Sequence, residues 1–233
     1  MTNSLEKCDG CLCWVKGIAG AKKTVIVTGH ARGGTSAIAW TLQHLGVPMF
    51  GPGAGLVPFL EDVEMRVALK TRNSELLRSL VAARNDTYDL WGFKLPNIYS
   101  YVDGVLPYLA NPHVVSVFRD MVAVAGRQFN VDGISTEDEQ RMRWADIRHE
   151  MAMQFNMAIA PDVPHLMISY ERMLQDPQPT VNHLQEFLDI APPQHRRELA
   201  VNHIREHVAN RFGWVHEQWG SLSTLLERGR QSS

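Results

Sequence analysis

Hydrophobic and polar positions along the chain follow two alternating patterns. Short apolar runs, rich in β-branched and aromatic residues, are typical of strands buried in a parallel sheet. The longer segments between them carry apolar residues at helical spacing. Strands that alternate with helices in this way predict a three-layer α/β/α fold with a central, mostly parallel sheet. The predicted strands are Thr24–Thr28, Asp89–Lys94, His113–Phe118 and His165–Ser169.

Capping residues, glycine and proline indicate where the helices begin and end. Thr136 and Glu139 have the spacing of a capping box, and Asp176 followed by Pro177 is typical of an N-cap and first helical position. The Gly- and Pro-rich stretch 46–58 predicts a long loop. The predicted helices run from about Ser36 to Gly46, over Glu61–Leu80 as one or two helices, from Thr136 to about Ile159, and from Pro177 to Leu188.

The stretch TVIVTGHARGGTS joins the first strand to the first helix through a glycine-rich turn. It places Gly29, Gly34 and Ser36 where a nucleoside-triphosphate loop has its glycines and hydroxyl, but Thr35 stands at the lysine position. The nearest cation is Arg32, inside the turn. Such a turn still offers backbone N–H groups and a helix N-terminus to a phosphate or sulfate. The sequence therefore predicts a P-loop-like anion site that does not use ATP as a kinase does.

Cations also follow the ends of other predicted strands. Lys94 and Arg119 each end a strand, as Arg32 does within the loop. Ligands of parallel α/β sheets bind beyond the carboxyl ends of the strands, so we expect these cations on one rim. Arg127 comes eight residues after Arg119, a little over two helical turns, and can face the same pocket. A ligand with two separated anionic groups would suit this arrangement.

Composition limits the remaining function classes. The 233 residues carry a formal net charge of −2, so no global field attracts nucleic acid or an anionic membrane. No apolar run has the length of a signal peptide or membrane span, and we expect a soluble, cytoplasmic protein. Residues 1–22 are expected to be a leader, disordered in part, before a single domain over 23–233. The three cysteines, Cys8, Cys11 and Cys13, fit no disulfide framework and give no complete metal site.

Four segments, taken in order, resemble the sulfotransferases that use 3′-phosphoadenosine-5′-phosphosulfate (PAPS). GHARGGTS is similar to their 5′-phosphosulfate loop, and WGFKLP to the strand that carries a lysine near the sulfonate. VVSVFRDMVAVAGR is similar to their 3′-phosphate segment. LMISYERMLQDPQPTVNHLQEFLDI resembles the Tyr-Glu and Asp-Pro stretch of bacterial members. The resemblance covers about residues 24–190 and implies PAPS as co-substrate, with no metal ion.

The resemblance also implies roles for individual residues. Arg32 and Lys94 would stabilise charge on the transferred sulfonate. PFLEDVEMR is similar to the acidic segment that supplies a catalytic base, which favours Glu61, with Asp62 and Glu64 as alternatives. The acceptor would be a hydroxyl of a carbohydrate or small molecule. The donor would be held by Arg32, Gly33, Gly34, Thr35 and Ser36 at one end and by Arg119 and Arg127 at the other.

Two departures from the family pattern keep other functions open. Arg127 stands where the family has a serine, and no histidine follows Lys94 closely. A magnesium-dependent kinase-like enzyme is one alternative, although Thr35 replaces its loop lysine. A non-catalytic nucleotide binder without a working base is another. Tyr170 is expected to be structural, and most of the ten histidines, which include His30 in the loop, are expected on polar faces. The acceptor and the oligomeric state stay open.

Overall fold

A central β-sheet organises the chain, for which a computed structural model describes residues 6–8, 11–13, 22–51, 60–158 and 163–206. The sheet has the strand order β1-β2-β7-β6-β3-β5-β4. The strands from β7 to β4 are all parallel, whereas β2 pairs antiparallel with β7 and β1 pairs antiparallel with β2. The strands are β1 (Glu6–Cys8), β2 (Cys11–Cys13), β3 (Lys23–Gly29), β4 (Met49–Phe50), β5 (Leu90–Lys94), β6 (Pro112–Phe118) and β7 (His165–Ser169).

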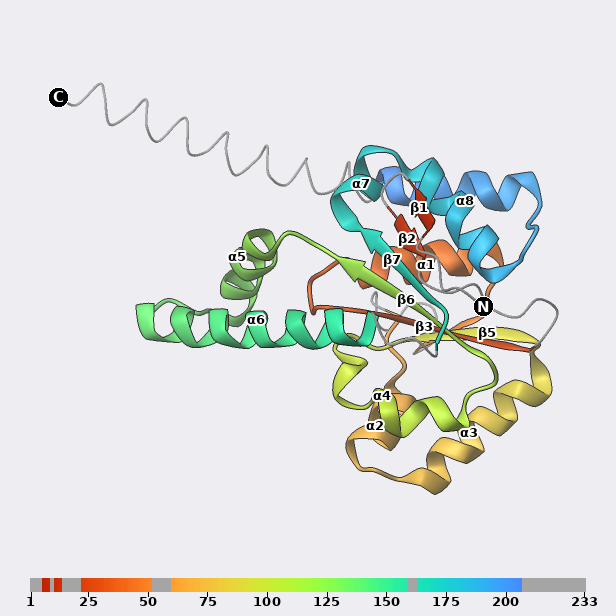
Figure 1. The fold of residues 1–233 in the computed structure, drawn as a ribbon, viewed down its shortest axis with the longest axis horizontal. Helices are drawn as coiled ribbons and strands as arrows, with labels where there is room; N and C mark the ends of the chain where they lie inside the picture. Colours follow the sequence, from red (N-terminus) through yellow and green to blue (C-terminus); the bar gives the residue numbers. More distant parts are fainter. Residues whose placement is uncertain (1–5, 9–10, 14–21, 52–59, 159–162, 207–233) are drawn as a thin grey trace.

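Helices cover both faces of this sheet, which confirms the predicted three-layer α/β/α fold (Figure 1). Successive residues of a strand point to opposite faces. In β3, Val25 and Val27 pack with α1, α8 and the helix over 194–206, whereas Ile26 packs with α2, α3 and α4. The helices are α1 (Thr35–Leu45), α2 (Val63–Lys70), α3 (Ser74–Thr87), α4 (Val102–Val105), α5 (Met121–Asp132), α6 (Glu137–Ala158), α7 (Tyr170–Gln175) and α8 (Pro177–Leu188), with short 3₁₀ turns η1 (Ile98–Ser100) and η2 (Leu106–Tyr108).

The predicted caps form as their sequences indicate. Gly46 ends α1 in the left-handed conformation, with φ of 97°. Asp176 caps α8 by accepting a hydrogen bond from the backbone of Gln178. Ahead of α6, Thr136 and Glu139 exchange side-chain and backbone hydrogen bonds in a capping box. These helix starts and stops are therefore confirmed.

Three parts of the chain differ from the sequence-based expectation. The segment Glu61–Leu80 forms two helices, one of the two expected alternatives, because Asn73 caps a new helix start; the second helix differs in continuing to Thr87. The predicted loop 46–58 contains the short strand β4, and its residues 52–59 lie outside the described part. The predicted leader 1–22 supplies the hairpin β1–β2. Residues 207–233 of the predicted domain also lie outside the described part.

Within the ranges that the structure describes, no helix has the length and apolar character needed to cross a bilayer. Over the same ranges, no group of three or more His, Cys, Asp and Glu side chains is placed to hold a metal ion.

Candidate functional site

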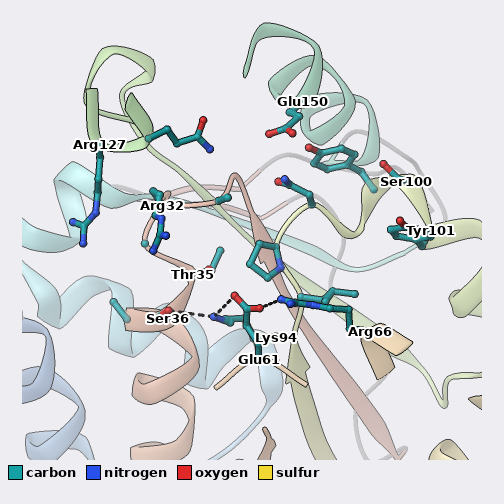
Figure 2. A pocket seen from close by; sticks show the side chains of 18 of the residues that line it. Arg32, Thr35, Ser36, Glu61, Arg66, Lys94, Ser100, Tyr101, Arg127 and Glu150 are labelled. Carbon is teal, nitrogen blue, oxygen red and sulfur yellow. Dashed lines mark hydrogen bonds and ion pairs between the residues drawn. The ribbon is translucent and has the colours of Figure 1, made fainter. Parts of the chain in front are cut away.

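A cavity of about 950 Å³ lies at the carboxyl ends of β3 and β5, where the loop after β3 meets residues of α2, η1, α5 and α6 (Figure 2). β3 lies between β5 and β6 in the sheet, so the chain leaves it toward one side first and returns to the other side later. Open α/β sheets bind ligands at such a reversal of strand order. The loop contributes four residues to the lining of the cavity: Arg32, Gly34, Thr35 and Ser36.

The glycine-rich loop is held in one conformation by close packing. Gly34 has φ of 100° and forms the N-cap of α1 without a capping side chain, so the first N–H groups of the helix are left for another partner. A Cβ at Gly34 would lie 2.2 Å from Cδ2 of the buried Tyr170. The Gly33 N–H donates to the His30 carbonyl at 2.8 Å and tightens the turn. Tyr170 thus supports the loop, in the structural role expected of it.

Lys94, at the end of β5, lies against the start of α1. Its Nζ is 3.2 Å from Ser36 Oγ and 3.4 Å from Glu61 Oε1, and its side chain is 1% exposed (Figure 2). Burial lowers the pKa of Lys94 to about 7, with further lowering by the charges of Arg66 and Arg32. An anion placed beside such a buried ammonium stabilises its charged form and raises its pKa.

Glu61 is the acidic residue of its segment that faces the cavity. Its two carboxylate oxygens are paired with cations, Oε1 with Lys94 and Oε2 with Arg66 (Figure 2). Residue 61 also forms a parallel β-bridge with Lys94, which fixes the backbone beside the end of β5. The carboxylate therefore contacts the lysine and lines the same cavity as the loop.

The two alternatives to Glu61 are engaged elsewhere. Asp62 is 2% exposed, accepts from the Met65 N–H at 3.0 Å as the N-cap of α2, and pairs with Arg84 at 2.6 Å. The side chain of Glu64 is 71% exposed, and Arg84 lies 3.5 Å from it. Neither residue lines the cavity.

The two arginines that follow β6 in the sequence, Arg119 and Arg127, occupy different positions. Arg127, on α5, lines the cavity on the same side as Arg32 (Figure 2). Burial lowers the pKa of Arg127, and the charges of Arg119 and Arg32 lower it further. Arg119 does not line the cavity; its Nη1 donates to the Arg32 carbonyl at 2.8 Å, and its guanidinium lies 4.9 Å from the centre of the Tyr170 ring. Arg119 thus braces the loop backbone and adds positive charge beside Arg127.

Another carboxylate, Glu150 of α6, also lines the cavity and was not singled out in the sequence (Figure 2). Its Oε2 lies 2.5 Å from Nε2 of His30, which is only 3% exposed and so departs from the polar-face expectation. Burial by itself would raise the pKa of Glu150, but the hydrogen bond and charge of His30, the charge of Arg143 and a hydrogen bond with Tyr99 together lower it. His30 stood in the loop motif, yet nothing in the sequence linked it to a residue 120 positions away.

Comparison with known proteins places the chain in a family. The sequence profile described as "Sulfotransferase family" matches residues 60–194, more than half of the chain. The chain therefore belongs to the sulfotransferase family. No curated protein matches the sequence.

Solved structures agree on the fold. The sulfotransferase STF9 from Mycobacterium avium is 12% identical, with a TM-score of 0.51 over 82% of this chain and 68% of its own. The sulfotransferase domain from the curacin biosynthetic pathway is 15% identical, with a TM-score of 0.50 over 76% of each chain. At these identities the likeness shows the three-layer fold alone.

Proposed function

We propose that the protein transfers a sulfuryl group from PAPS to a hydroxyl of a carbohydrate or small-molecule acceptor. The observation that carries the proposal is the buried Lys94, placed between Ser36 at the start of α1 and the cavity-facing carboxylate of Glu61. A cation, an anion-binding helix N-terminus and a base in one cavity are the groups that this transfer needs.

The donor would span the cavity from the loop to α5. Backbone N–H groups of the loop, with Gly33 and Gly34 allowing close approach and Thr35 and Ser36 opening α1, would hold the phosphosulfate. Arg32 lines this end, and Arg127 of α5, which lines the same cavity, would bind the 3′-phosphate. Arg119 would act through the loop, because its hydrogen bond goes to the Arg32 carbonyl. Both ends of a doubly anionic donor thus have cations.

The transfer itself would use the two charged groups at the end of β5. The acceptor oxygen forms a bond to sulfur, the bond between sulfur and the bridging phosphate oxygen breaks, and the hydroxyl proton passes to Glu61. Lys94 and Arg32 would stabilise the charge on the leaving oxygen and the sulfonate. When Lys94 turns to the sulfonate, Oε1 of Glu61 loses its cation and becomes a better proton acceptor. No step in this scheme requires a metal ion.

Binding of 3′,5′-adenosine bisphosphate (PAP), followed by isothermal titration calorimetry, tests the donor site. We expect binding in the micromolar range, and transfer of label from ³⁵S-PAPS to at least one member of a panel of hydroxylated acceptors. Absence of PAP binding at millimolar concentration would contradict the proposal. Magnesium-dependent ATP turnover without sulfuryl transfer would favour a kinase-like enzyme instead.

Substitution of the base separates transfer from donor binding. Glu61→Gln should lower kcat by about 10²–10⁴-fold while changing the Kd of PAP little, because general-base catalysis acts only on the acceptor proton. Glu64→Gln is the matched control, since its side chain is exposed and outside the cavity. Full activity of Glu61→Gln would move the base to another residue.

A further inference from the structure

The cavity extends past Glu61, on the side away from the arginines assigned to the donor. Figure 2 shows Arg32 and Arg127 to one side of Glu61, and Arg66 and Tyr101 to the other. In a displacement at sulfur, the acceptor oxygen must approach in line with the bond that breaks, from the side opposite the leaving oxygen. The part of the cavity that Arg66 and Tyr101 line, here called the acceptor side, is therefore where the acceptor would enter.

Helix α2 presents two cations to the cavity on this side. One face of the helix packs into the core through Met65, Ala68 and Leu69. Arg66 and Lys70 both line the cavity, and residues four apart in a helix lie next to each other on its surface. The helix thus holds two positive side chains one turn apart beside the place where the acceptor would bind.

The two cations differ in what they already contact. Arg66 pairs with Oε2 of Glu61, but its side chain is 38% exposed and a guanidinium has five N–H donors, more than one carboxylate oxygen uses. Lys70 is exposed, and among the residues that the structure describes no acidic side chain lies within ion-pair distance of its ammonium. Its place in the last turn suits the helix dipole, which does not require a position at a cavity.

Other carboxylates that line the cavity do not offset this charge. Asp132 pairs with Arg143 at 2.6 Å, and Glu150 lies 2.5 Å from His30. Asp132 belongs to α5 and Glu150 to α6, whereas Lys70 belongs to α2. The acceptor side therefore carries positive charge that a ligand can neutralise.

We propose that the acceptor carries an anionic group, a carboxylate or a sulfate, besides the hydroxyl that receives the sulfuryl group, and that Lys70 and Arg66 bind this anion. The inference rests on the proposed function for the transfer itself. Helix α2 begins two residues after Glu61, and with a rise of about 1.5 Å per residue Lys70 lies about 6 Å farther along it than Arg66. The anion should thus be remote from the accepting hydroxyl, as the carboxylate of a hexuronic acid is from its ring hydroxyls.

Binding of three related sugars to the protein saturated with PAP tests the charge preference. The probes are methyl glucuronide, methyl glucoside 6-sulfate and the neutral methyl glucoside, each titrated by saturation-transfer NMR. We expect both anions to bind at least about 10-fold more tightly than the neutral sugar, as for a hydrogen bond to a charged group. Equal affinity of the charged and neutral sugars in the unsubstituted protein would overturn the proposal.

Substitution of Lys70 assigns the preference to α2. Lys70→Gln should remove most of the difference between the charged and neutral sugars, and Lys70→Arg, which keeps the charge, should retain it. Arg72→Gln is the matched control, because it removes an exposed cation two residues away that does not line the cavity. A preference that persists in Lys70→Gln, or that is lost equally in Arg72→Gln, would overturn the proposal.

Transfer kinetics with ³⁵S-PAPS give a second readout. Lys70→Gln should raise the KM of an anionic acceptor by about 10-fold and leave kcat nearly unchanged, because the ammonium binds a group remote from the reacting atoms. A fall in kcat at unchanged KM would overturn the proposal. If the unsubstituted protein neither binds PAP nor transfers label, the proposed function fails by itself, since the sugar titrations still measure the charge preference and its dependence on Lys70.

Discussion

The two walls of the cavity are built by different means. The wall formed by the loop after β3 and the end of β5, here called the strand-end wall, continues the ladder of the sheet: Val27 pairs with Lys94, and the Asn97 N–H donates to the Gly29 carbonyl. The wall formed by η1, α5 and α6, here called the helical wall, is held by side chains such as Gln154, whose amide donates to the Val117 carbonyl at 2.9 Å.

This difference in construction implies that the two walls differ in rigidity. In the strand-end wall a shift of the Lys94 backbone would require breaking hydrogen bonds of a buried sheet, so the point from which its side chain extends is preorganised. In the helical wall, the partly exposed Asp132–Arg143 pair joins α5 to α6. Contacts of that kind contribute little to stability and can change without disturbing the fold. We therefore expect the groups around Lys94 to be rigid and the helical wall, which also carries Arg127, to be adaptable.

The most severe way to break the strand-end wall is Gly34→Ala. The new Cβ would collide with the Tyr170 ring at a residue with φ of 100°, a conformation that costs a non-glycine residue energy. We expect PAP binding to weaken at least about 100-fold, because the loop is displaced. Calorimetry measures the loss, and Gly104→Ala is the control, since nothing lies within 4 Å of its Cβ position. Equal PAP affinity in Gly34→Ala would show that the loop does not hold the donor.

Asp62→Asn removes the buried ion pair between Asp62 and Arg84, which lies next to Glu61 in the strand-end wall. The Asp62 carboxylate and Arg84 are 3% and 6% exposed, so the substitution leaves a buried cation with only the exposed Glu64, 3.5 Å away, as a counter-ion. We expect the free energy of unfolding to fall by about 3 kcal/mol, measured by urea denaturation. The exposed Glu64, substituted by Gln, should change it by less than about 0.5 kcal/mol. A catalytic defect in Asp62→Asn without loss of stability would return Asp62 to the candidates for the base.

The pKa of Lys94 gives the strand-end wall a pH dependence. Because burial lowers that pKa to about 7, the ammonium is present below pH 7 and is lost as the pH rises through it. The KM for PAPS should therefore rise above pH 7, by up to about 10-fold per pH unit. Lys94→Met should remove this pH dependence while raising KM at pH 6. A profile that is flat in the unsubstituted protein between pH 6 and pH 8.5 would contradict a role for the lysine in binding.

Arg143→Gln changes the helical wall and should have the smallest effect on stability and on PAP binding. It removes a partly exposed ion pair with Asp132, which is worth no more than about 1 kcal/mol. Thermal unfolding should show a small decrease in Tm, and the Kd of PAP should stay within a few-fold. A loss as large as that of Asp62→Asn would mean that the helical wall is as tightly held as the strand-end wall.

Much of the fold could be predicted because its signals are local. Val25, Ile26 and Val27 are all fully buried, two against one helical layer and one against the other, which gives β3 its unbroken apolar run. Caps such as Asp176 act within a few residues. β4 was missed because it has two residues between glycine and proline, and β1 and β2 because three residues each are too few for a pattern.

Among the site residues, too, those with a local signal in the sequence could be predicted and the others could not. Arg32 and Lys94 could be placed because their positions follow from strand ends. The choice among Glu61, Asp62 and Glu64 depends on where α2 begins, since the N-cap engages Asp62 and leaves Glu61 before the helix. Arg119 donates to a loop carbonyl in the structure, and its expected contact with a phosphate stays a prediction. The pairing of His30 with Glu150 depends on how α6 lies over the loop, which no local pattern encodes.

The hairpin β1–β2 has a practical consequence for anyone who shortens the protein. Because β2 pairs with β7, removal of residues 1–21 as a dispensable tail would uncover the main-chain N–H and C=O groups of a central-sheet strand. An uncovered strand of this kind recruits strands from other molecules. A truncated version chosen for easier crystallisation would thus be more prone to aggregate than the 233-residue chain.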